Sequence, residues 1–267
     1  MLDPVIEIAR TYSVRQQVGG PRLRLGTIWF LILLICLASG SALVTIVFAA
    51  VAAVAGLQTA GAWRLRKVAV NQVVAAAGAA LLPLAAWLGL RAVGVVLFLL
   101  VIAAVVLGAD TTLDGSSFAV DRLKANLPVA SATLRSGMFV GLTAAAVVQV
   151  HRIDAMSLLF LMSVVCVYDS GDYLVGSGAS NRFAGPLAGM AGGVVVVAAM
   201  TAINPPPLTD DGDVRLLGLL MVLACPLGQM LASWTLPSSR AKAPALRRLD
   251  AWMVAAPLFL VGLWLAT

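Results

Sequence analysis

Charged side chains are scarce in this sequence of 267 residues. Asp, Glu, Lys and Arg make up only 11% of the chain, whereas soluble domains carry about 25%. Hydrophobic residues make up 61%, and the mean hydropathy is +1.00. Apolar runs of membrane length recur from Ile28 onward, continuous rather than alternating. The composition argues against a soluble domain and predicts an all-α polytopic membrane protein.

Histidine and cysteine are also rare, with one His and three Cys in the chain. Cys36, Cys166 and Cys225 all lie in apolar runs, so we expect small packing residues and neither a disulfide nor a metal site. His151 is expected in a solvated outer loop. The net charge of +6 does not indicate nucleic-acid binding, because basic residues cluster at the ends of apolar runs, where they orient spans and meet lipid headgroups.

Long polar loops are absent too, so the sequence predicts one membrane domain. We expect residues 1–26 to form a cytosolic N-terminal segment and residues 27–267 to form a single transmembrane domain. No apolar region lies early enough for a cleaved signal peptide. The expected location is a bacterial inner (plasma) membrane.

The apolar run over residues 28–63 contains Ser39-Gly40-Ser41, which leaves two interpretations open. It forms either one long tilted helix or two segments. The positive-inside rule favours two, because the basic loop at residues 64–67 then faces the cytosol. By alternation the N-terminus is cytosolic, the C-terminus is outside, and about nine segments cross the membrane: 27–39, 42–63, 68–90, 92–108, 136–150, 155–172, 185–203, 216–236 and 251–267.

Two carboxylates, Asp169 and Asp172, lie at the end of the membrane-length run that starts at Ala155. Ionisable groups at that depth cost about 2.5–3.5 kcal/mol at a helix centre and are functional candidates. Residues three apart share a helix face, as two metal ligands should. The alternative is a helix-end loop in which both acids are solvated.

A second polar cluster, residues 241–250, falls on the same cytosolic face and contains Lys242, Arg247, Arg248 and Asp250. Carboxylates with clustered Arg and Lys suit a phosphate ligand bridged by Mg²⁺, which prefers oxygen ligands. The alternative is a positive-inside anchor that touches anionic headgroups without specificity.

These two clusters resemble motifs of one family. Asp169-Ser170-Gly171-Asp172-Tyr173, followed by Gly176, resembles the Asp-Ser/Thr-Gly-Ala-Tyr stretch of the phosphatidate cytidylyltransferases (CDP-diacylglycerol synthases). Leu246-Arg247-Arg248-Leu249-Asp250, before an apolar segment with Pro257, resembles their C-terminal signature. Those enzymes join CTP and phosphatidic acid with divalent metal.

The resemblance implies the family's multi-helix membrane fold, a phosphatidic-acid-like phospholipid as ligand and a homodimer. The metal ligands expected for Mg²⁺ are Asp169 and Asp250, which match the family's motifs, and Asp172, which stands where the family has alanine and would form a metal pair with Asp169. The expected phosphate or nucleotide contacts combine motif positions with nearby basic residues, and Arg247 among them stands where the family has aspartate. They are Ser170, Gly171, Tyr173, Gly176, Arg182, Lys242, Arg247 and Arg248.

The sequence departs from the family at most other motif positions. Gly185–Gly192 lacks the Lys, Thr and Glu expected there, and Gly228–Pro237 keeps only Gly228 and Ser233 of an acidic and basic motif. The glycines of 185–193 are typical of close helix packing. Losing even one preorganised catalytic contact costs about 2.7–4 kcal/mol.

We therefore expect a catalytically impaired cytidylyltransferase-like protein with a lipid-phosphate-binding or accessory-subunit role beside a membrane-protein partner. One alternative is an active, diverged transferase that makes CDP-diacylglycerol or a related CDP-lipid. The other is a small membrane transporter, which is disfavoured because the charged residues concentrate at one face.

Overall fold

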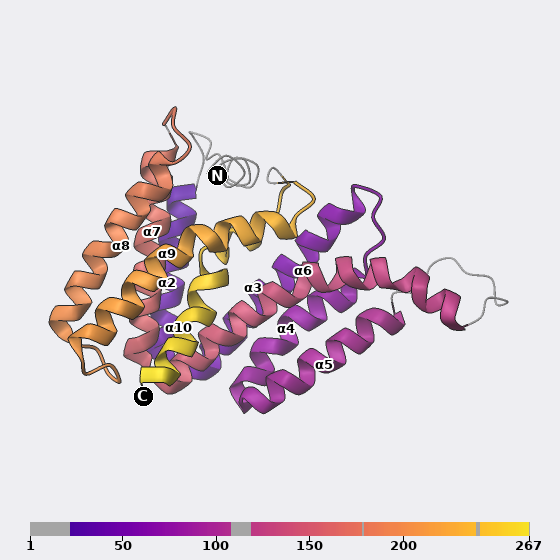
Figure 1. Cartoon of the computed structure of the whole chain (residues 1–267), viewed down its shortest axis with the longest axis horizontal. Coiled ribbons are helices and arrows are strands. Elements are labelled where there is room, and N and C mark those ends of the chain that lie inside the picture. Colours follow the sequence, from indigo (N-terminus) through magenta and orange to yellow (C-terminus); the bar gives the residue numbers. More distant parts are fainter. Residues whose placement is uncertain (1–21, 108–118, 178, 239–240, 267) are drawn as a thin grey trace, which may run out of the picture.

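The computed structural model describes residues 22–107, 119–177, 179–238 and 241–266, and gives side chains from Ile28 and again from Asn126. Over these ranges the chain forms nine α-helices, one 3₁₀ helix and no strand (Figure 1). The expectation of an all-α fold is confirmed. The expected N-terminal segment falls largely on residues 1–21, outside the described part of the chain.

The helices follow one another with short connections. Six contain a stretch long and apolar enough to cross a membrane: α3, α5, α6, α7, α8 and α9. The apolar parts of α2, α4 and α10 are shorter. The chain is thus consistent with a helical membrane protein, and nine crossings stay a prediction. The helices are α2 (Arg22–Ser39), α3 (Ser41–Arg64), α4 (Gln72–Leu88), α5 (Leu90–Leu107), α6 (Ala119–Ile153), α7 (Ala155–Gly176), α8 (Ala184–Ile203), α9 (Asp211–Thr235), η1 (Leu246–Arg248) and α10 (Trp252–Ala266).

The run over residues 28–63 forms two helices, α2 and α3, and not one. The break is at Gly40, whose φ of 94° is a conformation that glycine adopts without a steric penalty. The chain reverses at this point, so α3 leads back toward the side of the bundle from which α2 came (Figure 1). The two-segment interpretation is therefore the correct one, although α2 begins at Arg22, ahead of the expected start.

Helix α6 is longer than expected. We expected a connection over residues 110–135 and a span from Ser136, but the helix begins at Ala119. Ala130 and Thr133 are fully buried, and the Asn126 amide donates to the Val105 carbonyl at the end of α5, 3.1 Å away. The polar residues that suggested a loop lie on a helix because one of its faces packs on its neighbours. The expected charges between Asp110 and Lys124 lie outside the described side chains.

The helices form two groups. Helices α3, α4, α5 and α6 pack together, as do α7, α8, α9 and α10, and α6 joins the groups through contacts with α10 and α7. Aromatic pairs fix the interior, with ring centroids 5.7 Å apart in both Phe48–Trp252 and Phe160–Phe259. Successive helices reverse direction, so the end of α7 lies at the same side of the bundle as the ends of α3 and α9 (Figure 1).

Two aspartates on the opposite side of the bundle cap the starts of helices. Asp154 and Asp210 are N-caps: Asp154 accepts from the Ser157 amide at 3.0 Å, and Asp210 accepts from two amides at the start of α9. His151 lies in the last turn of α6, with both ring nitrogens buried. The expectation of a solvated loop for His151 was wrong, because α6 extends through it.

Candidate functional site

Asp169 and Asp172 lie on α7, within its last two turns. The helix continues to Gly176, so the alternative of a helix-end loop is wrong. Asp172 is 6% exposed, Asp169 is partly buried, and Tyr168 beside them is fully buried. Both acids therefore lie on ordered helical backbone within the protein interior or at its edge, and not in bulk water.

Glycines let α8 approach α7 closely at this point. A Cβ on Gly185 would lie 2.4 Å from Asp172 Oδ1, and a Cβ on Gly189 would lie 2.5 Å from the Tyr168 carbonyl oxygen. Gly171 and Gly176 face the same contact, since a Cβ on either would meet the Cα of Gly189 or Gly185. The expectation of close helix packing is confirmed. Gly171 and Gly176, expected at a phosphate, instead line a helix–helix contact.

A hydrogen-bonded chain joins α7 to α9 through Gln229. The Tyr168 hydroxyl donates to Gln229 Oε1 at 3.2 Å, and Gln229 Nε2 donates to Asp172 Oδ2 at 3.1 Å. The amide can do both because it carries an acceptor and a donor group. The network satisfies polar groups that burial would otherwise leave unpaired at a cost.

Asp250 comes from the other predicted cluster, directly before α10. Its Oδ1 accepts from the Ala251 amide at 2.8 Å, and its Oδ2 lies 3.6 Å from Arg247 Nη1. Arg247 Nη1 also donates to Ser233 Oγ of α9 at 3.0 Å. Burial raises the pKa of Asp250 to about 6, against the opposing effects of Arg247 and the Ala251 amide.

The structure brings the two predicted clusters together. Asp169 lies within electrostatic range of Asp172, Asp250 and Arg248, although the segments are far apart in sequence. A Cβ on Gly228 would lie 2.4 Å from the Asp250 carbonyl oxygen, so this glycine lets the connection before α10 approach α9. We call Asp169, Asp172, Asp250, Arg247 and Arg248 the acid–arginine cluster. Whether these residues bind a ligand stays a prediction.

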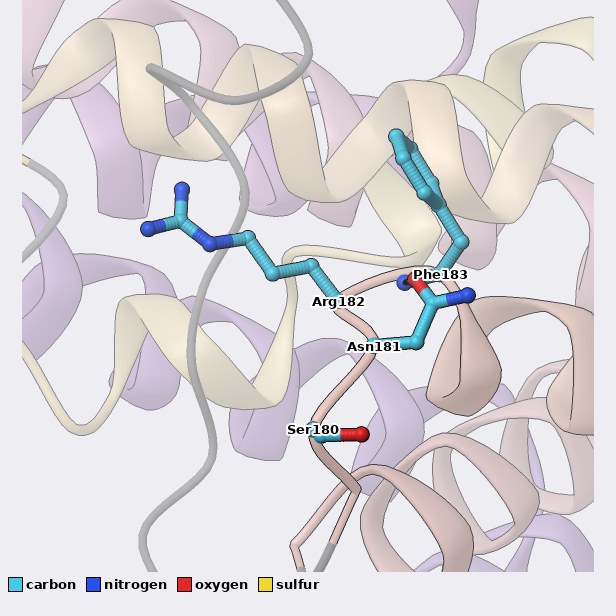
Figure 2. Close-up of a pocket in the computed structure, with 4 residues that line it drawn as sticks. All are labelled: Ser180, Asn181, Arg182 and Phe183. Carbon is cyan, nitrogen blue, oxygen red and sulfur yellow. Dashed lines mark hydrogen bonds between the residues drawn. The ribbon is translucent and has the colours of Figure 1, made fainter.

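The remaining predicted contacts are more peripheral. Ser170 is exposed, and its hydroxyl donates to the Cys166 carbonyl of its own helix at 2.7 Å. Tyr173 is partly buried, and Lys242 is exposed on the connection between α9 and η1. Arg182 borders an open hollow of about 350 Å³ before α8, lined by Ser180, Asn181, Arg182 and Phe183. Figure 2 shows the Arg182 side chain extending away from Asn181.

The donor types of the cluster fit Mg²⁺, but their arrangement does not form a ready metal site. Among residues 28–107, 126–177, 179–238 and 241–266, no three His, Cys, Asp or Glu side chains are grouped to hold an ion. Asp172 already accepts from Gln229, and Asp250 faces Arg247. A Mg²⁺ ion would therefore depend on Asp169 and on rearrangement of its neighbours.

Sequence reasoning missed Gln229 and gave no role to Gly228 or Ser233 beyond their resemblance to a motif. The signal for Gln229 was its position, directly after Gly228 in the stretch that resembles an acidic and basic motif. A neutral amide on an apolar helix does not stand out by charge, but it is a polar group that must find partners when buried. The structure shows that those partners are Tyr168 and Asp172.

Comparisons of the chain with family models, with curated proteins and with solved structures each gave no match. The resemblance to the cytidylyltransferases therefore stays a prediction that rests on two short motifs. Function has to be inferred from the chemistry of the acid–arginine cluster and its position in a membrane-type fold.

Proposed function

We propose that this chain is a cytidylyltransferase-like membrane protein that binds the phosphate headgroup of a lipid at the acid–arginine cluster and does not carry out nucleotidyl transfer. The observation that carries the proposal is that donors within the protein already engage most of the carboxylates. Two of the three carboxylates are held by donors of the chain itself, Asp172 by Gln229 and Asp250 by Arg247 and the Ala251 amide. Nucleotidyl transfer instead needs carboxylates available to metal ions that align and neutralise phosphates.

A phosphate headgroup is the ligand that suits the basic members of the cluster. Arg247 and Arg248 present planar guanidinium groups, which match phosphate oxygens in pairs. Both lie on η1, directly before α10, and both are partly exposed. This position at the end of the helical bundle is where the headgroup of a phosphatidic-acid-like phospholipid would lie.

The charge balance makes binding depend on a cation. Three carboxylates against two guanidinium groups leave an excess of one negative charge when all are ionised, so a phosphate alone is disfavoured. Mg²⁺ accompanying the phosphate reverses that balance, and such ions are commonly held by one or two carboxylates together with substrate phosphates. Asp169 is the carboxylate in the best position to take part, because no hydrogen bond found among the described residues engages its oxygens.

The membrane arrangement that goes with this proposal has nine crossings in a bacterial inner membrane, with the cluster on the cytosolic side. It is supported by the alternation of helix directions (Figure 1). It is also supported by two basic residues, Arg64 in the last turn of α3 and Arg66 just after it. A membrane-protein partner or a second copy of the chain would complete an accessory role. Labelling of single cysteines placed at Leu65 and at Asp210, from each side of sealed vesicles, tests the orientation.

The functional test combines turnover with binding. Purified protein is given labelled CTP, phosphatidic acid and Mg²⁺, and binding to phosphatidic acid in nanodiscs is measured with Mg²⁺ or EDTA. We expect no CDP-diacylglycerol, but Mg²⁺-dependent binding that Asp169→Asn and Arg248→Gln each weaken by about tenfold, or about 1.4 kcal/mol. Asp213→Asn, on the opposite side of the bundle, is the matched control and should bind normally.

The outcomes separate the proposal from its alternatives. Product formed by the wild type and lost in Asp169→Asn would establish the active, diverged transferase. Equal binding of phosphatidic acid and phosphatidylcholine by the wild type would refute headgroup recognition. Binding that is unaffected by EDTA would refute the role of the cation and leave the arginines as the sole contacts.

A further inference from the structure

The end of α9 is held by side chains from the other helix group. The last four carbonyls of a helix have no partner within it and need other donors. Here all four have one: Ala232 accepts from the Thr235 hydroxyl, and Ser233 accepts from the Leu236 amide. The Trp234 carbonyl accepts from Arg135 of α6, and the Thr235 carbonyl accepts from the Trp63 indole of α3 at 2.7 Å.

Arg135 is the centre of this arrangement. Its guanidinium carbon lies 3.9 Å from the centroid of the Trp234 ring and 4.9 Å from that of Trp63, so the cation lies against both indoles. One turn further along α6, Phe139 meets the Trp234 ring edge-on, with centroids 5.9 Å apart. A cation over indole faces is attracted to their negative π surface, and it also complements the negative end of the α9 dipole.

The same region holds the connection that carries the basic half of the acid–arginine cluster. Ser233, in the last turn of α9, accepts from Arg247, which in turn contacts Asp250. Gln58 of α3 accepts from the Ala245 amide at 2.9 Å, just before η1. Leu246 and Leu249, on either side of the two arginines, are fully buried. The position of Arg247 therefore depends on where the last turn of α9 is held.

We infer that Arg135 is a positioning residue: by clamping the end of α9 between Trp63 and Trp234, it places Ser233 and thereby Arg247 and Asp250 for headgroup binding. The ligand named in this inference rests on the proposed function. The placement of Arg247 and Asp250 by Arg135 does not depend on it. The clamp joins α3 and α6 to α9, so it also fixes the cluster relative to the other helix group. Arg135 itself touches no ligand.

The test compares Arg135→Leu and Arg135→Lys with the wild-type protein by hydrogen–deuterium exchange and by nanodisc binding. The amides to follow are those of Arg247, Arg248 and Leu249, which donate to carbonyls within the connection. For Arg135→Leu we expect about tenfold faster exchange at these amides and about tenfold weaker binding of phosphatidic acid. Lysine keeps the cation but loses the planar fork, so its effects should be intermediate.

Arg152→Leu is the matched control. Arg152 lies on the same helix and donates to the Ala86 carbonyl near the end of α4, at 2.9 Å, away from the cluster. It should lower thermal stability without changing exchange at Arg247–Leu249.

Two results would overturn the inference, and a third would keep the positioning role of Arg135 but reject the proposed ligand. Unchanged exchange at Arg247–Leu249 in Arg135→Leu overturns the inference, as does an equal increase along α7 and α8, which would mean a general loss of stability. If exchange changes locally while the wild type binds no phosphatidic acid, the positioning of Arg247 and Asp250 stands and the proposed ligand is wrong.

Discussion

Replacing Gly189 with alanine puts a methyl group into the contact between α7 and α8. The new Cβ would lie 2.5 Å from the Tyr168 carbonyl oxygen and 2.9 Å from Tyr168 Cδ2, both closer than van der Waals contact. The carbonyl belongs to the α7 backbone and the ring is fully buried, so neither can move aside freely. The helices must separate, and Tyr168 must shift away from Gln229.

The size of the effect follows from two opposing contributions. Adding buried methylenes to a well-packed core costs about 1–3 kcal/mol. Alanine is favoured over glycine within a helix by about 0.5–1 kcal/mol, which offsets part of that cost. Gly94 of α5 provides the reference, because a Cβ there meets nothing within 4 Å. Gly94→Ala should therefore stabilise the protein, and Gly189→Ala should be less stable than Gly94→Ala by about 1–3 kcal/mol.

The assay is thermal or SDS-induced unfolding of both variants and the wild type in the same detergent, followed by circular dichroism. Gly189→Ala should also weaken headgroup binding, since Tyr168 and Asp172 share Gln229 as partner. If the two alanine variants unfold alike, α7 and α8 do not approach each other as closely as described, and the placement of Asp172 against α8 falls with that contact.

Two further predictions concern the buried acids. Because burial raises the pKa of Asp250 from the ordinary 3.8 to about 6, the stability that it contributes is fully present below about pH 4 and is lost as the pH rises through 6, by about 3 kcal/mol in total. Unfolding midpoints in Mg²⁺-free buffer should fall more steeply between pH 4.5 and 7.5 in the wild type than in Asp250→Asn, which keeps Asp169 and Asp172; equal slopes would contradict it. Gln229→Glu places a second carboxylate within hydrogen-bond distance of Asp172, so it should destabilise the protein more at pH 8 than at pH 5. Gln72→Glu, whose side chain meets Arg64 on the surface, should be neutral at both, and a pH-independent effect of Gln229→Glu would refute the like-charge explanation.

Much of the fold could be predicted because helices of membrane length can be recognised in a sequence by their length and apolar composition. The break at Gly40 was predicted from Ser39-Gly40-Ser41 together with charge placement, because two helices before Arg64 would keep the basic loop on the expected cytosolic side. The start of α6 could not be predicted in this way. Its first part is polar, and only the packing of Ala130 and Thr133 against neighbouring helices shows that it continues the span.

The same distinction holds for the candidate site. Asp169 and Asp250 were predicted to meet, because both lie at cytosolic ends of expected segments and carry charge where charge is costly. Gln229 and Arg135 were not predicted. The uncharged amide of Gln229 does not carry a charge that would mark it within an apolar run. An arginine at the end of an expected span, such as Arg135, is already explained as a residue that orients the protein in the membrane. Their roles come from partners distant in sequence, which only the three-dimensional structure supplies.

The contact between Gly228 and Asp250 has a consequence for access to the cluster. Gly228 lies two turns before the end of α9 at Thr235, which at 1.5 Å per residue places Asp250 about 10 Å below the level at which that helix ends. Non-helical backbone at such a depth is tolerated where protein surrounds it or where it lines a water-filled recess. Asp250 is 5% exposed and Asp172 is 6% exposed, so protein surrounds both carboxylates. A phosphate that approaches the cluster therefore meets its partly exposed members, Asp169, Arg247 and Arg248, before the two buried acids.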